Sequence, residues 1–282
     1  MYRLGNYIHH IFDPSGNQQN HGIYIGSNYG QNLTTVNPSG CAEYHGITAY
    51  NVITNIDGGS GIQSRGPSTA QGAAADSAPW PSFHHNLIDT VAKHGVNMFD
   101  FRSRAYIWAN TILRAAQSPF FTNSDNISVA SGMYFGFNTI YDWGSSTFYP
   151  ACYSNGGNGG GSVRVESNVF FQVARSSSPA FNAFFSSSNG CQYVFNKNLW
   201  YNTSNTSLGV PSGDSPTVQT DPVFANAASN DFTPSIGSPM LNAGQTPPTP
   251  GVSIVAAFDA LGRSRPQSPS TNWARGAYER AS

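Results

Sequence analysis

The blocks "NTIYDW" (Asn138–Trp143), "NVFFQV" (Asn168–Val173) and "NLWYNT" (Asn198–Thr203) repeat one phrase at an interval of 30 residues. The phrase is an asparagine, usually a small or apolar residue, a large apolar residue, two variable residues and usually another apolar one. Earlier copies begin at Asn6, Asn51, Asn86 and Asn110, and the intervals along the chain run from 24 to 45 residues. A repeat of this length indicates a solenoid.

The short length of each block decides which solenoid to expect. No block continues the 3.6-residue period long enough for a helix, whereas each alternates an apolar position with variable neighbours, as a half-buried strand does. Two or three short strands per turn, with turn residues between them, predict an all-β parallel β-helix. The apolar positions expected to face inward are Ile8, Ile53, Ile88, Ile112, Ile140, Phe170 and Trp200.

The recurring asparagine has a structural explanation. Asn tolerates left-handed backbone angles better than most residues, so we expect it at the bend between two strands. Its amide can also bond the equivalent amide one rung away, which predicts a stacked ladder. All seven asparagines are therefore assigned to structure and not to substrate binding.

A second strand is expected in the early rungs, where Gly22, Gly61 and Gly95 each precede or open an apolar stretch. Aligning these strands places Ile23, Ile62 and Val96 inward. Alternation along a strand then predicts one outward row of Tyr24, Gln63 and Asn97, and a next outward row of Gly26, Arg65 and Phe99.

The chain changes character near Thr220, where it becomes rich in proline and loses the asparagine repeat. We therefore expect rungs over 1–219 and an irregular C-terminal cap of the same domain over 220–282, because a solenoid needs an element that covers its last rung. The residues expected to seal the core are Phe224, Phe232, Ile236 and Leu241. Salt bridges within the cap are expected among Asp259, Arg263, Arg265 and Glu279.

The rung pattern, together with the ending "DPVF…NDF…GSPMLNAG" and "DALGRSRP…GAYE", resembles right-handed parallel β-helix proteins of the pectate-lyase-like superfamily, especially bacterial secreted ones. The resemblance covers nearly the whole chain and implies the fold. It implies no particular chemistry, since many functions share this ending. Such proteins usually open with a capping segment, whereas this chain enters a rung at Asn6. An exposed first rung would favour end-to-end self-association.

Composition excludes several classes of partner. Only 10% of the residues are charged and the net charge is -1, which gives no electrostatic footprint for nucleic acid or an anionic membrane. No run of 18 apolar residues predicts a membrane span. The abundance of uncharged polar residues is common in secreted proteins that handle carbohydrate, so a polysaccharide partner and an extracellular or cell-surface location are expected. The segment "MYRLGNYIHH" lacks the pattern of a signal peptide.

Polar side chains concentrate in the middle rungs, over "SFHHNLIDTVAKHGVNMFDFRSR" (82–104), and the resembled superfamily places its sites in central rungs. A polysaccharide lyase removes the proton beside a uronate carboxylate, so it needs a base and cations. The candidates for catalysis are Lys93, His94, Arg102 and Arg104. The candidates for substrate binding are Tyr24, Gln63, Arg65, Asn97, Phe99 and Asp100.

Alternatives remain open. A glycoside hydrolase would need a pair of carboxylates, for which Asp57, Asp89 and Asp100 are the candidates. The same three side chains could supply oxygen ligands to calcium, although no spacing requires a metal and no cofactor is otherwise implied. His94 could instead hydrogen-bond within a turn, and the protein could be a non-catalytic glycan-binding or structural surface protein. Cys152 and Cys191 could form a disulfide that leaves Cys41 free, or all three could be buried thiols.

Overall fold

A computed structural model of the chain describes residues 2–12, 20–25, 47–65, 82–99, 105–124, 132–144, 152–154, 162–173, 180–185, 192–203, 209–245, 258–265 and 273–280. The remainder, which includes the three segments 26–46, 66–81 and 100–104 and two of the three cysteines, Cys41 and Cys191, lies outside the described residues. No helix among the described residues is long and apolar enough to cross a membrane.

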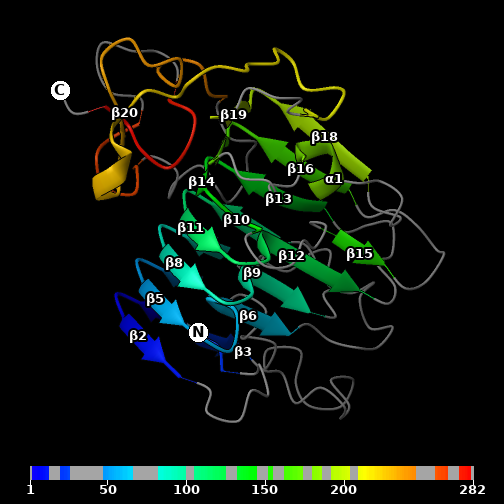
Figure 1. Cartoon of the computed structure of the whole chain (residues 1–282), viewed down its shortest axis with the longest axis vertical. Helices are drawn as coiled ribbons and strands as arrows, with labels where there is room; N and C mark the ends of the chain where they lie inside the picture. The colour runs from blue at the N-terminus through cyan, green and yellow to red at the C-terminus, as the bar shows by residue number, and fades with distance from the viewer. Residues whose placement is uncertain are drawn as a thin grey trace.

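The described strands form three parallel sheets that wind into a coil, as Figure 1 shows. Sheet 1 contains β1 (Tyr2–Leu4), β4 (Ile47–Ala49), β7 (Ser82–His84), β10 (Ala105–Trp108), β13 (Gly132–Gly136), β16 (Ser162–Glu166) and β18 (Gln192–Asn196). Sheet 2 contains β2 (Tyr7–Ile11), β5 (Val52–Ile56), β8 (Leu87–Val91), β11 (Thr111–Ala115), β14 (Thr139–Tyr141), β17 (Val169–Gln172) and β19 (Leu199–Asn202). Sheet 3 contains β3 (Ile23–Ile25), β6 (Ile62–Arg65), β9 (His94–Phe99), β12 (Ser118–Ser124) and β15 (Cys152–Ser154).

Each turn of the coil takes one strand from each sheet in the early rungs, so the fold is a right-handed parallel β-helix, as predicted. The register on sheet 2 pairs the seven predicted inward positions with one another from Ile8 to Trp200. These side chains stack in the interior with the inward residues of the other two sheets. The short helix α1 (Phe181–Phe184) adds Phe181 and Phe184 to this core.

The asparagine ladder is present and runs the length of the coil. Each side-chain amide from Asn6 to Asn168 donates through Nδ2 to Oδ1 of the next asparagine, at 2.8–3.0 Å. The prediction that asparagine itself takes the left-handed conformation is wrong. The residue before each asparagine does so, with φ between 51° and 67°, as at Tyr50, Ala109 and Gly5. The asparagine follows the bend and stays free to extend its amide along the coil.

The glycine at the start of the second strand is needed because two rungs approach closely there. A Cβ on Gly95 would lie 2.5 Å from Cγ2 of Ile112 and 2.5 Å from the carbonyl oxygen of Pro119. The recurring glycine is therefore a packing feature of the corner between sheets 2 and 3.

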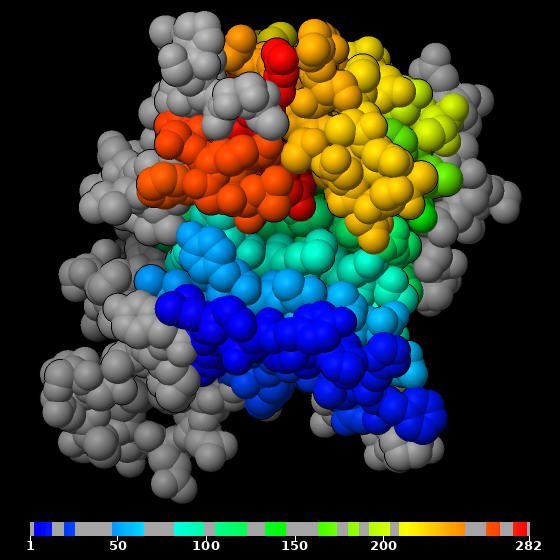
Figure 2. All heavy atoms as spheres, turned by 90° about the vertical axis from the view of Figure 1, so that its left-hand side faces the viewer, coloured from blue at the N-terminus to red at the C-terminus, as the bar shows by residue number. Residues whose placement is uncertain are grey.

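The C-terminal segment does not simply close the end of the coil. Its hairpin, β20 (Phe224–Asn226) and β21 (Asp231–Pro234), lies against the outer face of sheet 2, where Phe232 packs with Leu113 and Tyr141. Figure 2 shows the segment over the upper part of this face, with the first rungs uncovered below it. Phe232 is buried, but against this outer face and not over the interior core that it was predicted to seal, and Ile236 is 78% exposed. Met240 is buried against Val169 and Leu199.

The predicted salt bridges within the segment are present. Arg263 Nε donates to Asp259 Oδ2 at 2.7 Å, and Arg265 Nε lies 3.9 Å from Glu279 Oε1. Where the rungs end and the cap begins, near 219, stays a prediction.

Candidate functional site

The outward row predicted on sheet 3 is present. Tyr24 pairs in register with Gln63, and Gln63 with Asn97. The two amides are bonded, since Asn97 Nδ2 donates to Gln63 Oε1 at 3.0 Å. Tyr24 is about half exposed, and its ring stacks on His21 with the centroids 5.8 Å apart. The row therefore offers an exposed aromatic face and the partly buried amide of Gln63, whereas Asn97 is only 7% exposed and holds Gln63 from below the surface. Aromatic faces and amides are the groups that sugar rings and their hydroxyl groups contact.

Arg65 and Phe99 also pair in register, as predicted, and each lies two residues after Gln63 or Asn97 on its strand. Nothing is described of their side chains. Gly26, Asp100, Arg102 and Arg104 lie outside the described residues. Their assigned roles stay predictions.

His94 is held below the surface. It is 4% exposed, its Nδ1 lies 2.6 Å from the hydroxyl of Ser118, and its ring stacks on Phe121 at 4.6 Å. Burial, with a smaller effect of the Lys93 charge, lowers the pKa of His94 to about 3. The imidazole is therefore neutral at ordinary pH, and its polar contacts suit a structural role in the corner.

Lys93 lies in the tight turn between β8 and β9. Its backbone N–H donates to the carbonyl of Gly59 at 3.0 Å, and its own carbonyl accepts from Gln117 at 2.9 Å, which holds the turn between two neighbouring rungs. The side chain is partly buried, and the loss of solvent lowers the pKa of Lys93 below its usual value. Its charge contributes, after burial, to the lowered pKa values of His21 and His94.

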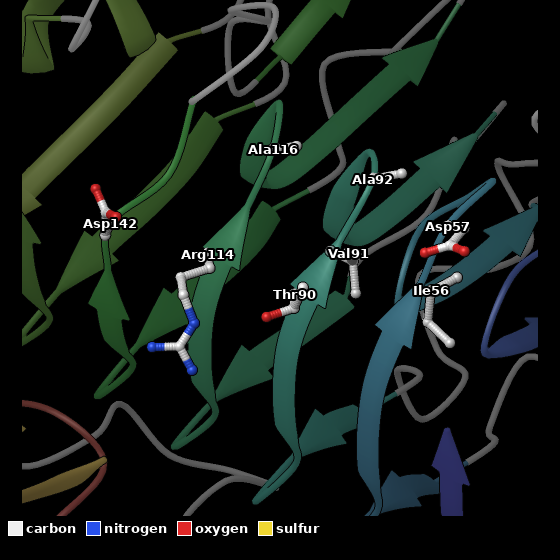
Figure 3. A pocket seen from close by; sticks show the side chains of 8 residues that line it. All are labelled: Ile56, Asp57, Thr90, Val91, Ala92, Arg114, Ala116 and Asp142. Carbon is white, nitrogen blue, oxygen red and sulfur yellow. The ribbon is translucent and has the colours of Figure 1, made fainter. Parts of the chain in front are cut away.

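A groove of about 430 Å³ lies at the corner between sheets 2 and 3. Figure 3 shows its side chains on four successive rungs, with Asp57 at one end and Asp142 at the other. Ala92 and Ala116 line it, and Lys93 follows Ala92 directly in the chain. The groove therefore runs along the coil axis beside Lys93. It is lined by Ile56, Asp57, Thr90, Val91, Ala92, Arg114, Ala116 and Asp142.

The guanidinium of Arg114 is already engaged. Its Nε donates to Asp89 Oδ1 at 2.8 Å, NH2 donates to the other oxygen of Asp89, and both terminal nitrogens reach Oδ1 of Asn230 at 3.2 Å. Arg114 therefore neutralises Asp89 and ties sheet 2 to the C-terminal segment. It is not a spare cation for a substrate carboxylate.

The carboxylates of the groove are poorly placed for glycoside hydrolysis. Asp57 and Asp142 stand three rungs apart, which at about 4.8 Å per rung is about 14 Å. Retaining and inverting glycosidases need roughly 5 to 9.5 Å between the two carboxyl groups. The Asp57–Asp142 pair is therefore too widely spaced for either mechanism.

The described residues gather no group of three or more His, Cys, Asp or Glu side chains that could hold a metal ion. Of the three aspartates proposed as calcium ligands, Asp89 is paired with Arg114 and Asp100 is outside the described residues. A calcium site therefore stays a prediction.

Sequence reasoning did not find the groove. Its floor is made by alanines, which carry no chemical signal. The usable signal was the column of variable positions four residues after each asparagine, which places Thr90, Arg114 and Asp142 in one row. All three take left-handed backbone angles in the structure, with φ of 53°, 48° and 54°.

These features define a right-handed parallel β-helix protein with the pectate-lyase-like fold. The chain is similar to the solved structure described as "Crystal structure of pectate lyase Pel9A", with a TM-score of 0.54 and 13% sequence identity. The match covers 99% of this chain and 65% of that one, so this chain spans about two thirds of that protein's length. At this identity the likeness shows the fold alone. No protein-family profile and no curated protein sequence matches the chain.

Proposed function

We propose that this protein binds an acidic, uronate-containing polysaccharide along the corner groove and the sheet 3 row, and cleaves it by β-elimination with Lys93 as the base. The observation that carries the proposal is the position of Lys93. Lys93 occupies the turn between β8 and β9, where it follows the groove residue Ala92 and precedes the strand that carries Asn97, and burial lowers the pKa of its partly buried amine.

The chemistry needs a neutral amine near the sugar. The base takes the proton beside the uronate carboxylate, the electron pair forms a carbon–carbon double bond, and the glycosidic oxygen leaves with a proton from solvent. Desolvation raises the neutral fraction of a lysine at a given pH, which makes it a better base. His94 supports this arrangement as an uncharged neighbour of Lys93.

The substrate's carboxylate needs a counter-charge while the proton is removed. Arg114 is committed to Asp89, so we assign this task to Arg65, Arg102 and Arg104, which follow the sheet 3 strands in the sequence. Tyr24 stacks on a sugar ring, Gln63 bonds its hydroxyl groups, and Asn97 supports this binding by holding the amide of Gln63. Phe99 and Asp100 complete the binding surface of this proposal. A substrate of this size places the protein outside the cell or on its surface.

The competing candidate is glycan binding without cleavage. The burial of His94 favours it, because one of the two bases suggested by the sequence is not presented to a substrate. In this alternative the groove and the row bind the same polysaccharide, and Lys93 contributes only its positive charge.

The test is a pair of matched lysine substitutions, since the chain has two lysines, at 93 and at 197. Arginine keeps the positive charge but does not give up its proton, so it cannot act as a base. With a uronate polymer as substrate, the unsaturated product is followed by its ultraviolet absorbance. Lys93→Arg should lower the rate at which this product forms by about a hundredfold or more. Lys197→Arg, between β18 and β19, should leave the rate unchanged.

The wild-type rate should rise with pH through the neutral and mildly alkaline range, because the neutral form of Lys93 becomes more abundant until the lowered pKa is passed. Full activity of Lys93→Arg would exclude Lys93 as the base. Binding of the polymer without any product would favour the non-catalytic alternative.

A further inference from the structure

His21, which the site described above does not use, holds one fixed tautomer. It lies at the corner before β3, where the backbone N–H of Ser60 donates to His21 Nδ1 at 2.9 Å. A neutral imidazole whose Nδ1 accepts a hydrogen bond carries its proton on Nε2. Burial, with a smaller effect of the Lys93 charge, lowers the pKa of His21 to about 4, so the ring is neutral at ordinary pH. His21 therefore offers a hydrogen-bond donor, and not an acceptor, at Nε2.

This donor is available at the surface. Nε2 of His21 has no hydrogen-bond partner among the described residues, and it does not belong to their side-chain atoms that are buried without a partner. His94 occupies the same corner position two rungs away, but it is 4% exposed and its Nδ1 meets the hydroxyl of Ser118. His21 is only partly buried. The same residue type is thus enclosed in one rung and reaches the surface in the other.

The ring of His21 extends the aromatic surface of Tyr24. The two rings are nearly parallel, with an angle of 20° between their planes, and their centroids are 5.8 Å apart, so they overlap only in part. Tyr24 is 52% exposed. A sugar ring that stacks on Tyr24 is wide enough for its substituents to reach the edge of His21.

Gln63 provides a second donor beside Tyr24. The two residues pair in register on neighbouring strands, which lie about 4.8 Å apart. Gln63 Oε1 accepts from Asn97 Nδ2 at 3.0 Å, whereas its Nε2 hydrogens have no partner among the described residues. Tyr24 is therefore bordered by two uncharged donors, Nε2 of His21 and Nε2 of Gln63.

A surface that offers fixed donors favours a ligand group that only accepts. A hydroxyl group both donates and accepts, so either tautomer of a histidine can serve it, whereas an ionised carboxylate has acceptor sites alone. Hydrogen bonds to a carboxylate are also about twice as strong as those between neutral groups. The tautomer of His21 is thus matched to a carboxylate.

We infer that His21 is a specificity-determining residue of the proposed site, and that its Nε2–H binds the carboxylate of the uronate that stacks on Tyr24. Gln63 donates to a neighbouring oxygen of the same sugar. The inference rests on the proposed function, because it takes the uronate polymer as the ligand.

This uronate is not the one that loses its proton. The corner positions of His21 and His94 are two rungs apart, which at about 4.8 Å per rung is about 10 Å, and Lys93 directly precedes His94. His21 therefore acts on binding and not on the chemical step, so its loss should raise KM while kcat stays the same.

Two substitutions separate the surface donor from the bond to Ser60. An asparagine places its oxygen near the position of Nδ1, so His21→Asn can still accept from Ser60 but lacks the donor at Nε2. A glutamine places its nitrogen near the position of Nε2, so His21→Gln keeps the donor and loses the bond to Ser60. His9→Asn, which changes an exposed histidine on β2, is the matched control.

The measurement is calorimetric binding of a polyuronate and of its methyl ester to variants that also carry Lys93→Arg, so that the polymer is not cleaved. His21→Asn should weaken binding of the ionised polymer by about tenfold and binding of the ester by much less. His21→Gln and His9→Asn should bind the ionised polymer within about threefold of the parent. A purely structural role would reverse the order of the two His21 variants.

Unchanged binding in His21→Asn, or an equal loss in a folded His21→Gln, would overturn the inference. If His21→Gln does not fold, the ester decides, since an equal loss for both polymers in His21→Asn would also overturn it. A parent that binds no polyuronate overturns the proposed function together with the inference. Weakened binding in His21→Asn, with no unsaturated product from the wild type, would contradict the elimination alone and support the role of His21.

Discussion

Buried histidines should make the folding stability of this protein depend on pH. Burial, the largest cause in each case, lowers the pKa of His84 to about 3, of His85 to about 4 and of His94 to about 3. Their bonds suit neutral rings. His85 Nε2 donates to the carbonyl of Phe258 at 3.1 Å, which leaves its Nδ1 to accept from Nδ1 of His84 at 2.8 Å.

Acid should therefore unfold the protein more easily. In the unfolded chain these histidines bind protons with a pKa near 6.5, whereas in the folded chain they stay neutral down to about pH 4. The stabilisation is fully present above pH 6.5 and is lost as the pH falls below it. At pH 5.5 each of these histidines should lower the free energy of unfolding by about 1.4 kcal/mol relative to its value well above pH 6.5.

The measurement is the urea midpoint at pH 7.5 and at pH 5.5. Asp214 and Glu279, whose pKa values burial raises, act in the opposite direction over the pH range between their ordinary values, 3.8 and 4.5, and their raised ones. The comparison with His94→Gln, which can still bond Ser118, isolates the histidine, and this variant should show a smaller difference between the two midpoints. The same difference in His94→Gln as in the wild type would show that the His94 ring does not stay neutral.

Within each rung, the corner between sheets 1 and 2 depends on the asparagine ladder. Asn110 Oδ1 accepts from the backbone N–H of Asn86 at 3.1 Å and from its Nδ2 at 2.9 Å, and all of these atoms are buried. Asn6 occupies the same position in the exposed first rung. The same residue type thus occurs at a fully enclosed corner and at an open one.

Asn110→Ala should lower the free energy of unfolding by about 3 kcal/mol or more, because it leaves buried donors on Asn86 without an acceptor. Asn6→Ala should cost about 1 kcal/mol or less, since water can replace its bonds. Urea denaturation measures both losses. Equal losses at the two positions would contradict the view that enclosure, and not the asparagine alone, gives the ladder its stability.

The repeat made these corners predictable. An asparagine at every turn, followed at fixed offsets by apolar residues, gave the rungs, their inward column and the register of Tyr24, Gln63 and Asn97. The backbone conformation of the corner was not predictable in the same way. The left-handed residue is Tyr50, Ala109 or Phe137 in different rungs, so its identity carries no common signal.

At the scale of the whole chain, long-range packing determines features that the sequence did not predict. The C-terminal segment was expected over the last rung, but its hairpin covers the side of the coil, where Leu113 and Tyr141 present an apolar outer face. Apolar residues in the segment showed that it must pack somewhere without showing where. Likewise, the sequence placed His94 near Lys93 but could not show that Ser118 and Phe121 would enclose it.

The candidate site contains one feature that the sequence predicted and one that it did not. Its row on sheet 3 follows from strand alternation, whereas the groove beside it depends on how four rungs stack around two alanines. The chain passes from the groove residue Ala92 through the turn at Lys93 into β9, which carries Asn97, and the proposed elimination chemistry rests on that order. A single experiment distinguishes elimination from hydrolysis.

That experiment is digestion of a uronate polymer in isotopically labelled water, with the products weighed by mass spectrometry. Elimination takes no oxygen from water, so the account predicts that fragments analysed before their reducing ends exchange oxygen are unlabelled. Apart from the fragment that keeps the polymer's original non-reducing end, each should be one water lighter than a hydrolysis product, and all should be lost in Lys93→Arg. Fragments that carry one labelled oxygen would show a hydrolase and contradict the proposed mechanism.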